Sequence, residues 1–260
     1  MNEELTRIVE PETIKMKAMQ RIISLFMSPG ELMQNIKAYP VILVPFLVSV
    51  VIGLLTIVPA VSVSELETQE MNNIFIERFP DAEVNPFDFA AMAGEYGEID
   101  IGRVMSIATA VMFGVSAFAT PFIMCFIATL IIFVVCKILK GKAKFVQIFS
   151  MYMHIYVIIA LGTLVIYFLM STTGNYINMT SLAPVFMPNG NISMPLFNTL
   201  SGINIFSVWV ALLTFVGLKN LNEFSSVKAG VIVGADFVVT LALTIGMTAG
   251  SIWIMGLGVA

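Results

Sequence analysis

Two side chains stand out in the apolar tracts of this 260-residue chain as candidates for chemistry. They are Asp236, the single acid between Ala229 and Ala260, and His154, the single histidine of the chain. A carboxylate in apolar surroundings is costly, so such groups normally face other helices and have polar partners. If the last helix begins at about Ala229, Asp236 and His154 lie at a similar depth. We expect Asp236 to face the bundle interior within reach of His154, directly or through one water.

The role of this polar pair is left open by the sequence. In a structural interpretation, Asp236 is hydrogen-bonded to His154 or to tyrosine or threonine hydroxyls and serves packing. In a functional interpretation, it belongs to an ion, proton or ligand pathway. In a third, it is exposed to water through a cytoplasmic vestibule.

Two enzymatic arrangements can be drawn from the same region, and neither is favoured. Ser116 and His154 could form a nucleophile–base dyad, but a serine among small residues of a membrane helix is more often a packing residue. Gly234-Ala235-Asp236 is faintly similar to an aspartyl protease, whose chemistry needs two carboxylates. Motifs for phosphate loops, zinc proteases, dinucleotides and redox cysteines are absent from the sequence. We therefore expect no catalytic residues and no enzymatic activity.

The cysteines and the histidine predict no metal or cofactor either. Cys125 and Cys136 are 11 residues apart, which places them on nearly the same helix face but about 16 Å apart along the axis. That separation is beyond the reach of a disulfide. One histidine and two distant cysteines cannot assemble a conventional zinc site.

The composition is that of an integral membrane protein. Hydrophobic residues make up 58% of the chain and charged residues 12%, with a mean hydropathy of +0.94. Soluble domains carry about 25% charged residues. Transmembrane strands alternate apolar and polar residues, whereas the uncharged tracts here are apolar on every face. Helices are therefore expected, because they satisfy their own backbone hydrogen bonds in lipid.

The tracts predict an all-α protein with five transmembrane helices. A span needs about 20 apolar residues, and the 74-residue tract from Phe145 to Leu218 must therefore fold back at its turn-rich middle, around Pro188-Asn189-Gly190. We expect cytoplasmic amphipathic helices in residues 1–37 and a five-helix transmembrane domain in residues 38–260. The expected spans are about 38–61, 104–136, 145–170, 198–218 and 229–254, with outer loops at 62–103 and 171–197.

The distribution of lysine and arginine predicts the orientation. Basic residues gather in the first 37 residues and in the loops after the second and fourth spans, which lie on one side of a five-span bundle. They are Arg7, Lys15, Lys17, Arg21, Lys37, Lys137, Lys140, Lys142, Lys144, Lys219 and Lys228. Cytoplasmic loops carry the excess of basic residues. The amino terminus is therefore expected in the cytoplasm and the carboxyl terminus outside, in a cell membrane. The acid-rich outer segment is either solvated or a docking surface for a cationic partner.

The amino-terminal segment predicts two short helices. Apolar residues form one stripe along residues 12–26, and a membrane-surface helix and a helix packed on the bundle are both open. Ser28, Pro29 and Glu31 form a helix-start signal, so a second helix is expected to run to about Lys37. The basic residues expected at the membrane surface are Lys15, Lys17, Arg21, Lys137, Lys140, Lys142 and Lys144.

The last span carries two pairs of glycines at four-residue spacing. Gly230 and Gly234 form one pair, and Gly246 and Gly250 form the other. Small residues at this spacing let membrane helices approach closely. We expect these glycines to pack helices, either within the bundle or in self-association.

Three stretches resemble the bacterial branch of the Yip family of five-span membrane proteins, whose eukaryotic members are named for interaction with Ypt/Rab GTPases. They are Leu25–Ser49 (LFMSPGELMQNIKAYPVILVPFLVS), Gly141–Leu164, and Asn204–Gly234 with its Trp209 and Gly217-Leu218. The DLYGP-type signature of the eukaryotic members is absent, so their Rab-binding role does not transfer.

The resemblance implies a five-helix membrane domain without an assigned enzymatic activity. Its bacterial relatives include accessory subunits that work beside ABC-type export systems. We therefore expect a non-enzymatic scaffold or accessory subunit of a membrane transport or export assembly. The expected partners are the lipid bilayer and either ABC-type export subunits or a second copy, and no nucleic acid. The alternative is a small proton- or ion-coupled transporter or channel that uses Asp236 and His154.

Overall fold

The structure is a computed structural model, and it describes residues 14–78, 101–174, 177–186 and 194–254. These residues form helices and one isolated β-bridge, between Ser181 and Asn204. The helices are α1 (Ala18–Met27), α2 (Pro29–Ala38), α3 (Leu43–Leu55), α4 (Ile57–Arg78), α6 (Ile101–Ile138), α7 (Phe145–Thr173), α8 (Ala183–Phe186), α9 (Met194–Gly202), α10 (Ile205–Asn222) and α11 (Ser226–Ile254). The all-helical prediction is confirmed for this part of the chain.

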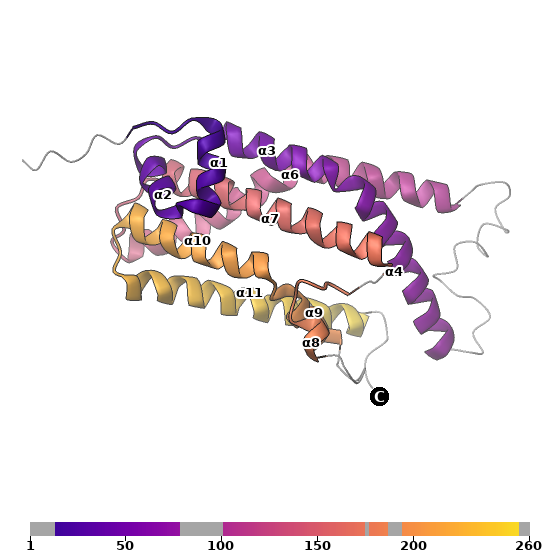
Figure 1. Cartoon of the computed structure of the whole chain (residues 1–260). Helices are drawn as coiled ribbons and strands as arrows, with labels where there is room; N and C mark the ends of the chain where they lie inside the picture. Colours follow the sequence, from indigo (N-terminus) through magenta and orange to yellow (C-terminus); the bar gives the residue numbers. More distant parts are fainter. Residues whose placement is uncertain (1–13, 79–100, 175–176, 187–193, 255–260) are drawn as a thin grey trace, which may run out of the picture.

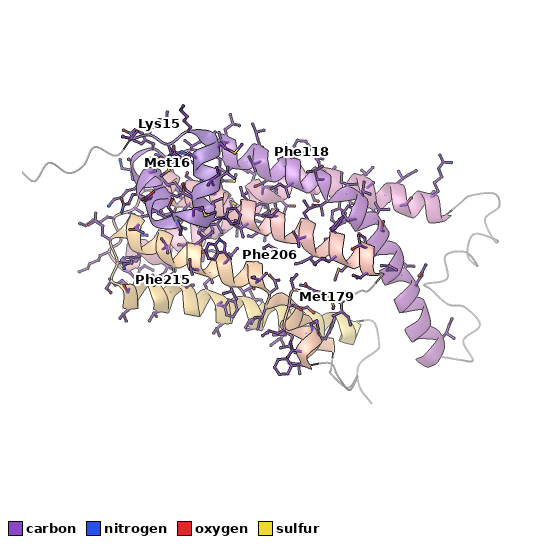
Figure 2. All side chains as sticks on the ribbon, viewed as in Figure 1. Lys15, Met16, Phe118, Met179, Phe206 and Phe215 are labelled. Atoms are coloured by element: carbon purple, nitrogen blue, oxygen red, sulfur yellow. The ribbon has the colours of Figure 1, made fainter. Side chains whose placement is uncertain are left out.

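The long helices lie side by side, and α1 stands across them at the end of the bundle that also carries α2 (Figure 1). Four described helices, α6, α7, α10 and α11, contain segments that are long and apolar enough to cross a membrane. A fifth span is formed if the bent pair α3 and α4 counts as one. Apolar side chains of α6 such as Val115 and Phe118 are 64% and 54% exposed. Phe118 lies on the outside of the bundle (Figure 2). This is the surface expected for helices in lipid.

The break between α3 and α4 has a local cause. The two helices meet at Thr56 with a bend of 42°. Pro59 follows three residues later, and a proline within a helix removes one backbone hydrogen bond and crowds the preceding turn. The Thr56 hydroxyl also donates to Ile52 O at 2.9 Å. Beyond the bend α4 continues to Arg78, further than the span end expected near residue 61.

The segment expected as a fourth span, residues 198–218, is two helices rather than one. α9 ends at Gly202, and Asn204 begins α10 with a capping box. The Asn204 side chain accepts from Phe206 N and Ser207 N, both at 3.0 Å, and Ser207 Oγ accepts from Asn204 N at 2.9 Å. This reciprocal cap satisfies amides that a continuous helix would have bonded internally. It places the start of the long helix at residue 205.

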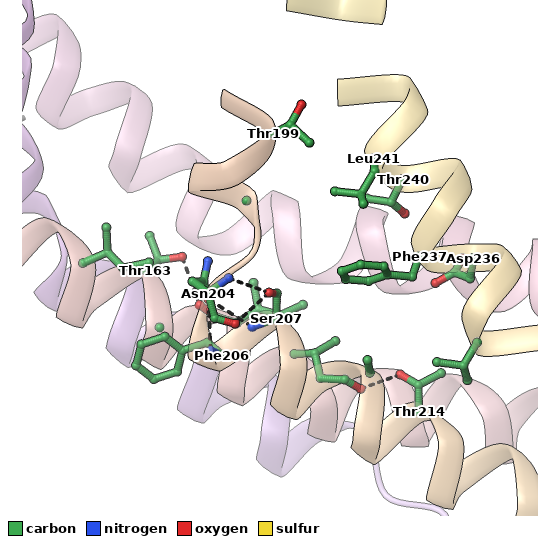
Figure 3. A pocket seen from close by; sticks show the side chains of 17 residues that line it. Thr163, Thr199, Asn204, Phe206, Ser207, Thr214, Asp236, Phe237, Thr240 and Leu241 are labelled. Carbon is green, nitrogen blue, oxygen red and sulfur yellow. Dashed lines mark hydrogen bonds between the residues drawn. The ribbon is translucent and has the colours of Figure 1, made fainter. Parts of the chain in front are cut away.

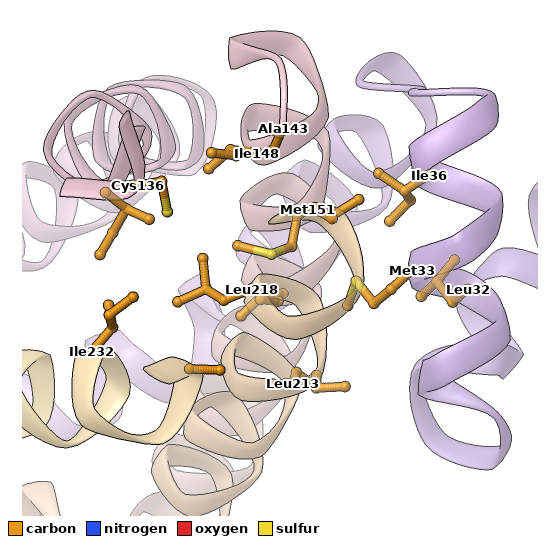
Figure 4. Close-up of a cluster of buried hydrophobic side chains, with 14 of the residues drawn as sticks. Leu32, Met33, Ile36, Cys136, Ala143, Ile148, Met151, Leu213, Leu218 and Ile232 are labelled. Carbon is orange, nitrogen blue, oxygen red and sulfur yellow. The ribbon is translucent and has the colours of Figure 1, made fainter. Parts of the chain in front are cut away.

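The core lies between α2, α6, α7, α10 and α11 and contains tightly packed methionines (Figure 4). Met33 and Met151 are fully buried and fill the space left by Gly217, where a Cβ would collide with the Met151 side chain. A Cβ at Gly162 would lie 2.7 Å from Phe206 Cγ. A Cβ at Gly53 would lie 2.9 Å from the Cβ of Ala117. Gly53, Gly162 and Gly217 therefore allow close contacts between helices. None of them belongs to the glycine pairs of the last span that were expected to pack helices.

The turn between α2 and α3 is held by side chains from α1 and α7. Buried Ser150 accepts a hydrogen bond from Val41 N at 3.0 Å and donates one to Val41 O at 2.7 Å. Gln147 donates to Lys37 O at 2.6 Å, and Arg21 donates to Tyr39 O at 2.9 Å. The carbonyl and amide groups that the turn withdraws from helical bonding are thereby paired.

Replacing Ser150 with alanine tests this arrangement. Ser150→Ala should lower the free energy of unfolding by about 1–3 kcal/mol, because Val41 N and O lose their partner in a buried site. The measurement is thermal unfolding in detergent. Ser171→Ala is the matched control, since the Ser171 hydroxyl bonds only Phe168 O of its own exposed helix end. Equal losses in the two variants would contradict the role assigned to Ser150.

Candidate functional site

The candidate site is a cavity of about 300 Å³ between α7, α9, α10 and α11 (Figure 3). Its walls are mainly apolar, and Asp236 supplies the one carboxylate among the described residues that line it. The other polar side chains at its wall are Thr163, Thr199, Asn204, Ser207, Thr214 and Thr240. A mostly apolar cavity with a few polar groups is the usual form of a small-molecule site.

Most of the hydroxyl protons at this wall are already used by the helices that carry them. Thr163 donates to Ile159 O at 2.9 Å, Thr214 donates to Val210 O at 2.8 Å, and Ser207 donates to Asn204 O at 2.8 Å. Their oxygens keep lone pairs that can accept. The cavity therefore presents hydrogen-bond acceptors beside the Asp236 carboxylate.

Asp236 and His154 occupy different surroundings. Asp236 is exposed at the cavity and makes no hydrogen bond or ion pair within the described part of the chain. His154 is fully buried, with Nδ1 2.7 Å from Ser150 O, and its Nε2 finds no partner among the described residues. His154 does not line the cavity. A direct hydrogen bond between the two is therefore missing here, and contact through a water stays a prediction.

The other residues considered for chemistry are not brought together. Ser116 donates to Phe113 O of its own helix at 2.9 Å and lines a second cavity, of about 110 Å³, to which His154 does not contribute. Cys125 and Cys136 are buried free thiols. Among the described residues, no three histidine, cysteine or acidic side chains form a group that could hold a metal ion.

The glycines of α11 have few neighbours. A Cβ at Gly230 would lie 3.9 Å from the Phe215 ring, an ordinary contact, whereas Gly234 and Gly246 have no described atom within 4 Å. The surroundings of Gly250 lie outside the described residues. In the apolar window Ser226–Leu243 of α11, 11% of the residues are buried, compared with 39% in α7. The packing expected of Gly234 and Gly246 is therefore not supplied by the described residues of this chain.

The basic residues expected at the membrane surface divide into two kinds. Lys15, Lys17, Lys137, Lys140, Lys142 and Lys144 are exposed. Arg21 differs, because it is 2% exposed and donates to Asn35 Oδ1 at 2.7 Å and to Tyr39 O. It ties α1 to α2, and its burial lowers the pKa of its guanidinium.

The opposite face of α1 is apolar and uncovered. Met19, Ile23 and Met27 are 71%, 52% and 81% exposed, while Arg21 and Ser24 point toward the bundle. Lys15 lies next to α1 at the same end of the bundle (Figure 2). A helix with its apolar face outward and basic residues beside it suits the surface of a membrane.

Glu223 joins two segments at this end of the bundle, and the sequence pattern did not single it out. It follows α10 in a left-handed conformation with φ 57°, and its carboxylate accepts from Lys142 at 2.5 Å and from Lys37 at 2.8 Å. These two ammonium groups lower the pKa of Glu223 to about 2. Glu223 is the single acidic residue in the basic loops after the second and fourth expected spans. That isolation is the sequence signal that could have identified it.

Comparison with known proteins gives a family match over most of the chain. The family model described as the Yip1 domain matches residues 23–250. No curated protein and no solved structure matches the chain.

The Glu223 bridge predicts a pH-dependent stability. Because the folded pKa of about 2 lies below the ordinary value of 4.5, the contribution of Glu223 is complete above about pH 5 and is lost as the pH falls toward 2. Wild type should therefore unfold at a higher temperature than Glu223→Gln at pH 7, and the difference should shrink on acidification. Glu31→Gln, which removes an exposed acid without an ion pair in the described residues, should leave the midpoint at pH 7 nearly unchanged. A wild-type advantage over Glu223→Gln that persists at pH 2 would contradict the bridge.

Proposed function

Because the chain belongs to the Yip1-domain family of multi-span membrane proteins, we propose that it is a non-enzymatic scaffold or accessory subunit of a membrane transport or export assembly. We place it in a cell membrane, with the amino terminus in the cytoplasm. Its proposed partners are ABC-type export subunits or a second copy of the chain. The resemblance to bacterial members of the family supports the transport setting.

The observation that carries the proposal is the outward face of α11. This helix packs against α9 and α10, and its far side carries one apolar stripe, formed by Val227, Val231, Gly234, Val238 and Ile245. These positions repeat at three-, four- and seven-residue steps, which keeps them on one face. A glycine in such a stripe allows a neighbouring membrane helix to approach closely. The stripe therefore suits a transmembrane helix of a partner.

The alternative, a small proton- or ion-coupled transporter or channel, draws support from the cavity beside Asp236. A coupled path through Asp236 and His154 needs both groups on one route. His154 is buried on α7 against Ser150 O and does not contribute to the cavity wall. We therefore keep the accessory role as the leading proposal.

Added bulk at Gly234 tests the docking face. With wild type, purification in mild detergent followed by mass spectrometry should recover ATPase and permease subunits of an export system, or a second copy in native mass spectra. Gly234→Leu should keep the thermal midpoint, because nothing described lies within 4 Å, yet lose the partner.

The controls separate docking from folding. Gly114→Leu adds the same bulk to α6, where the nearest described neighbour is Ile57 Cδ1 at 4.0 Å, and should retain the partner. Gly162→Leu should lower the midpoint, because its Cβ meets Phe206. A wild-type protein that purifies as a lone oligomer and moves ions in liposomes would instead support the transporter.

The orientation is tested by reporters. Because basic residues concentrate on one side of the five expected spans, a phosphatase fused after residue 260 should be active outside and a fluorescent protein there should stay dark. Reporters fused after residue 140, in the basic loop between α6 and α7, should show the reverse. A carboxyl-terminal reporter that works in the cytoplasm alone would overturn the proposed orientation.

A further inference from the structure

Among the described residues, no cation pairs with the carboxylate of Asp236. Asp236 lies seven residues after Ala229, where the last span is expected to begin, which is about 10 Å along the helix axis and inside the apolar part of a membrane. A charged group at that depth is costly unless a partner or water meets it. No lysine or arginine is among the described residues that line the cavity. Lys228, on the same helix, instead donates to Leu139 O at 3.1 Å.

We propose that the cavity beside Asp236 binds a membrane-soluble molecule that carries a protonated amine on a hydrocarbon chain. The amine supplies the positive charge that the cavity wall lacks. The inference concerns the inner face of α11 and does not depend on the partner proposed for its outer face.

The hydrogen-bonding character of the wall favours an amine over other polar groups. Thr163, Ser207 and Thr214 have already donated their hydroxyl protons to backbone carbonyls, so their oxygens are left as acceptors. An ammonium group has three protons to donate and no acceptor, and it therefore matches both these oxygens and the carboxylate. A phosphate or carboxylate ligand would meet these acceptor oxygens and the negative charge of Asp236, with the Asn204 Nδ2 amide as a donor beside them.

The remaining walls suit the hydrocarbon part. Ile159, Ile166, Val210, Phe237 and Leu241 line the cavity, whose volume is about 300 Å³. Small-molecule sites typically measure about 300–1,000 Å³ and are lined mainly by apolar side chains. In Figure 3, Phe237 and Leu241 come from α11 on the side that also carries Asp236, while Phe206 and Ser207 come from α10. A short alkyl chain therefore has apolar surface on both sides of the polar end.

The test compares three ligands with one chain length on purified protein in phosphatidylcholine nanodiscs at pH 7. The ligands are decylamine, decanol and decanoate, and the readouts are the shift of the thermal midpoint and the dissociation constant from native mass spectrometry. Decylamine should bind wild type saturably and at least about tenfold more tightly than decanol, because the amine pairs with a carboxylate in a low-dielectric site. Decanoate should bind most weakly.

Two variants and a control assign the binding to the cavity. Asp236→Asn keeps the shape but removes the charge, so it should abolish the preference for decylamine. Ala211→Phe fills the cavity from α10 and keeps the carboxylate, so it should weaken both decylamine and decanol. Glu31→Gln removes an exposed acid of α2, far from the cavity wall, and should bind as wild type does.

The proposal is overturned if wild type binds decylamine and decanol equally, or if Asp236→Asn binds decylamine as wild type does. The folding of each variant is first checked without ligand, by gel filtration and by its thermal midpoint. If Asp236→Asn fails to fold, the wild-type preference for amine and the Ala211→Phe result still decide. Because the assay uses the isolated protein, its failure leaves the co-purification result for Gly234→Leu unaffected.

Discussion

The turn between α2 and α3 is the constraint on which the arrangement of the bundle depends. Backbone groups of Lys37, Tyr39 and Val41 leave helical bonding at a partly buried turn, where polar groups without a hydrogen-bond partner are costly. Three side chains pair them, from α1 (Arg21) and from α7 (Gln147 and Ser150). The same contacts therefore fix α1 across the end of the bundle, α2 over the core and α3 beside α7.

The sequence predicted the all-helical fold because backbone N–H and C=O groups in lipid must find their hydrogen-bond partners within the protein. Uncharged tracts of this length do so as helices. It did not predict where helices break. Pro59 divides the first span, and Asn204 divides the fourth by offering a reciprocal cap. Both residues lie inside apolar segments, so the mean hydropathy of the surrounding residues does not reveal the break. The break at Ser28 was predictable because it joins two helices outside the apolar tracts, where a proline follows it directly.

The sequence supports an expectation about the depth of Asp236 and His154 along their helices, but it does not predict the direction in which either side chain points. Depth follows from the rise per residue, so Asp236 and His154 were both expected well inside the bundle. Which way each side chain points depends on the neighbours of α7 and α11, and both helices are apolar on all sides. For the same reason Arg21 was wrongly expected at the surface. In the structure the apolar face of α1 points outward, as suits contact with lipid, and Arg21 points toward the bundle. The glycines show the same limit, since Gly162 and Gly217 matter through Phe206 and Met151, residues distant in sequence.

Helix α11 carries the two surfaces to which function is assigned, and helix geometry keeps them apart. Gly234 precedes Asp236 by two residues, which places them about 160° apart around the axis. The described cavity wall takes Val233, Asp236, Phe237, Thr240 and Leu241 from α11, and none of these belongs to the outward stripe. A ligand in the cavity and a partner helix on the stripe do not compete for the same atoms. Because α11 packs mainly against α9 and α10 in the described part of the chain, a molecule in the cavity adds contacts to α7, α10 and α11 and so stabilises the helix that presents the docking stripe.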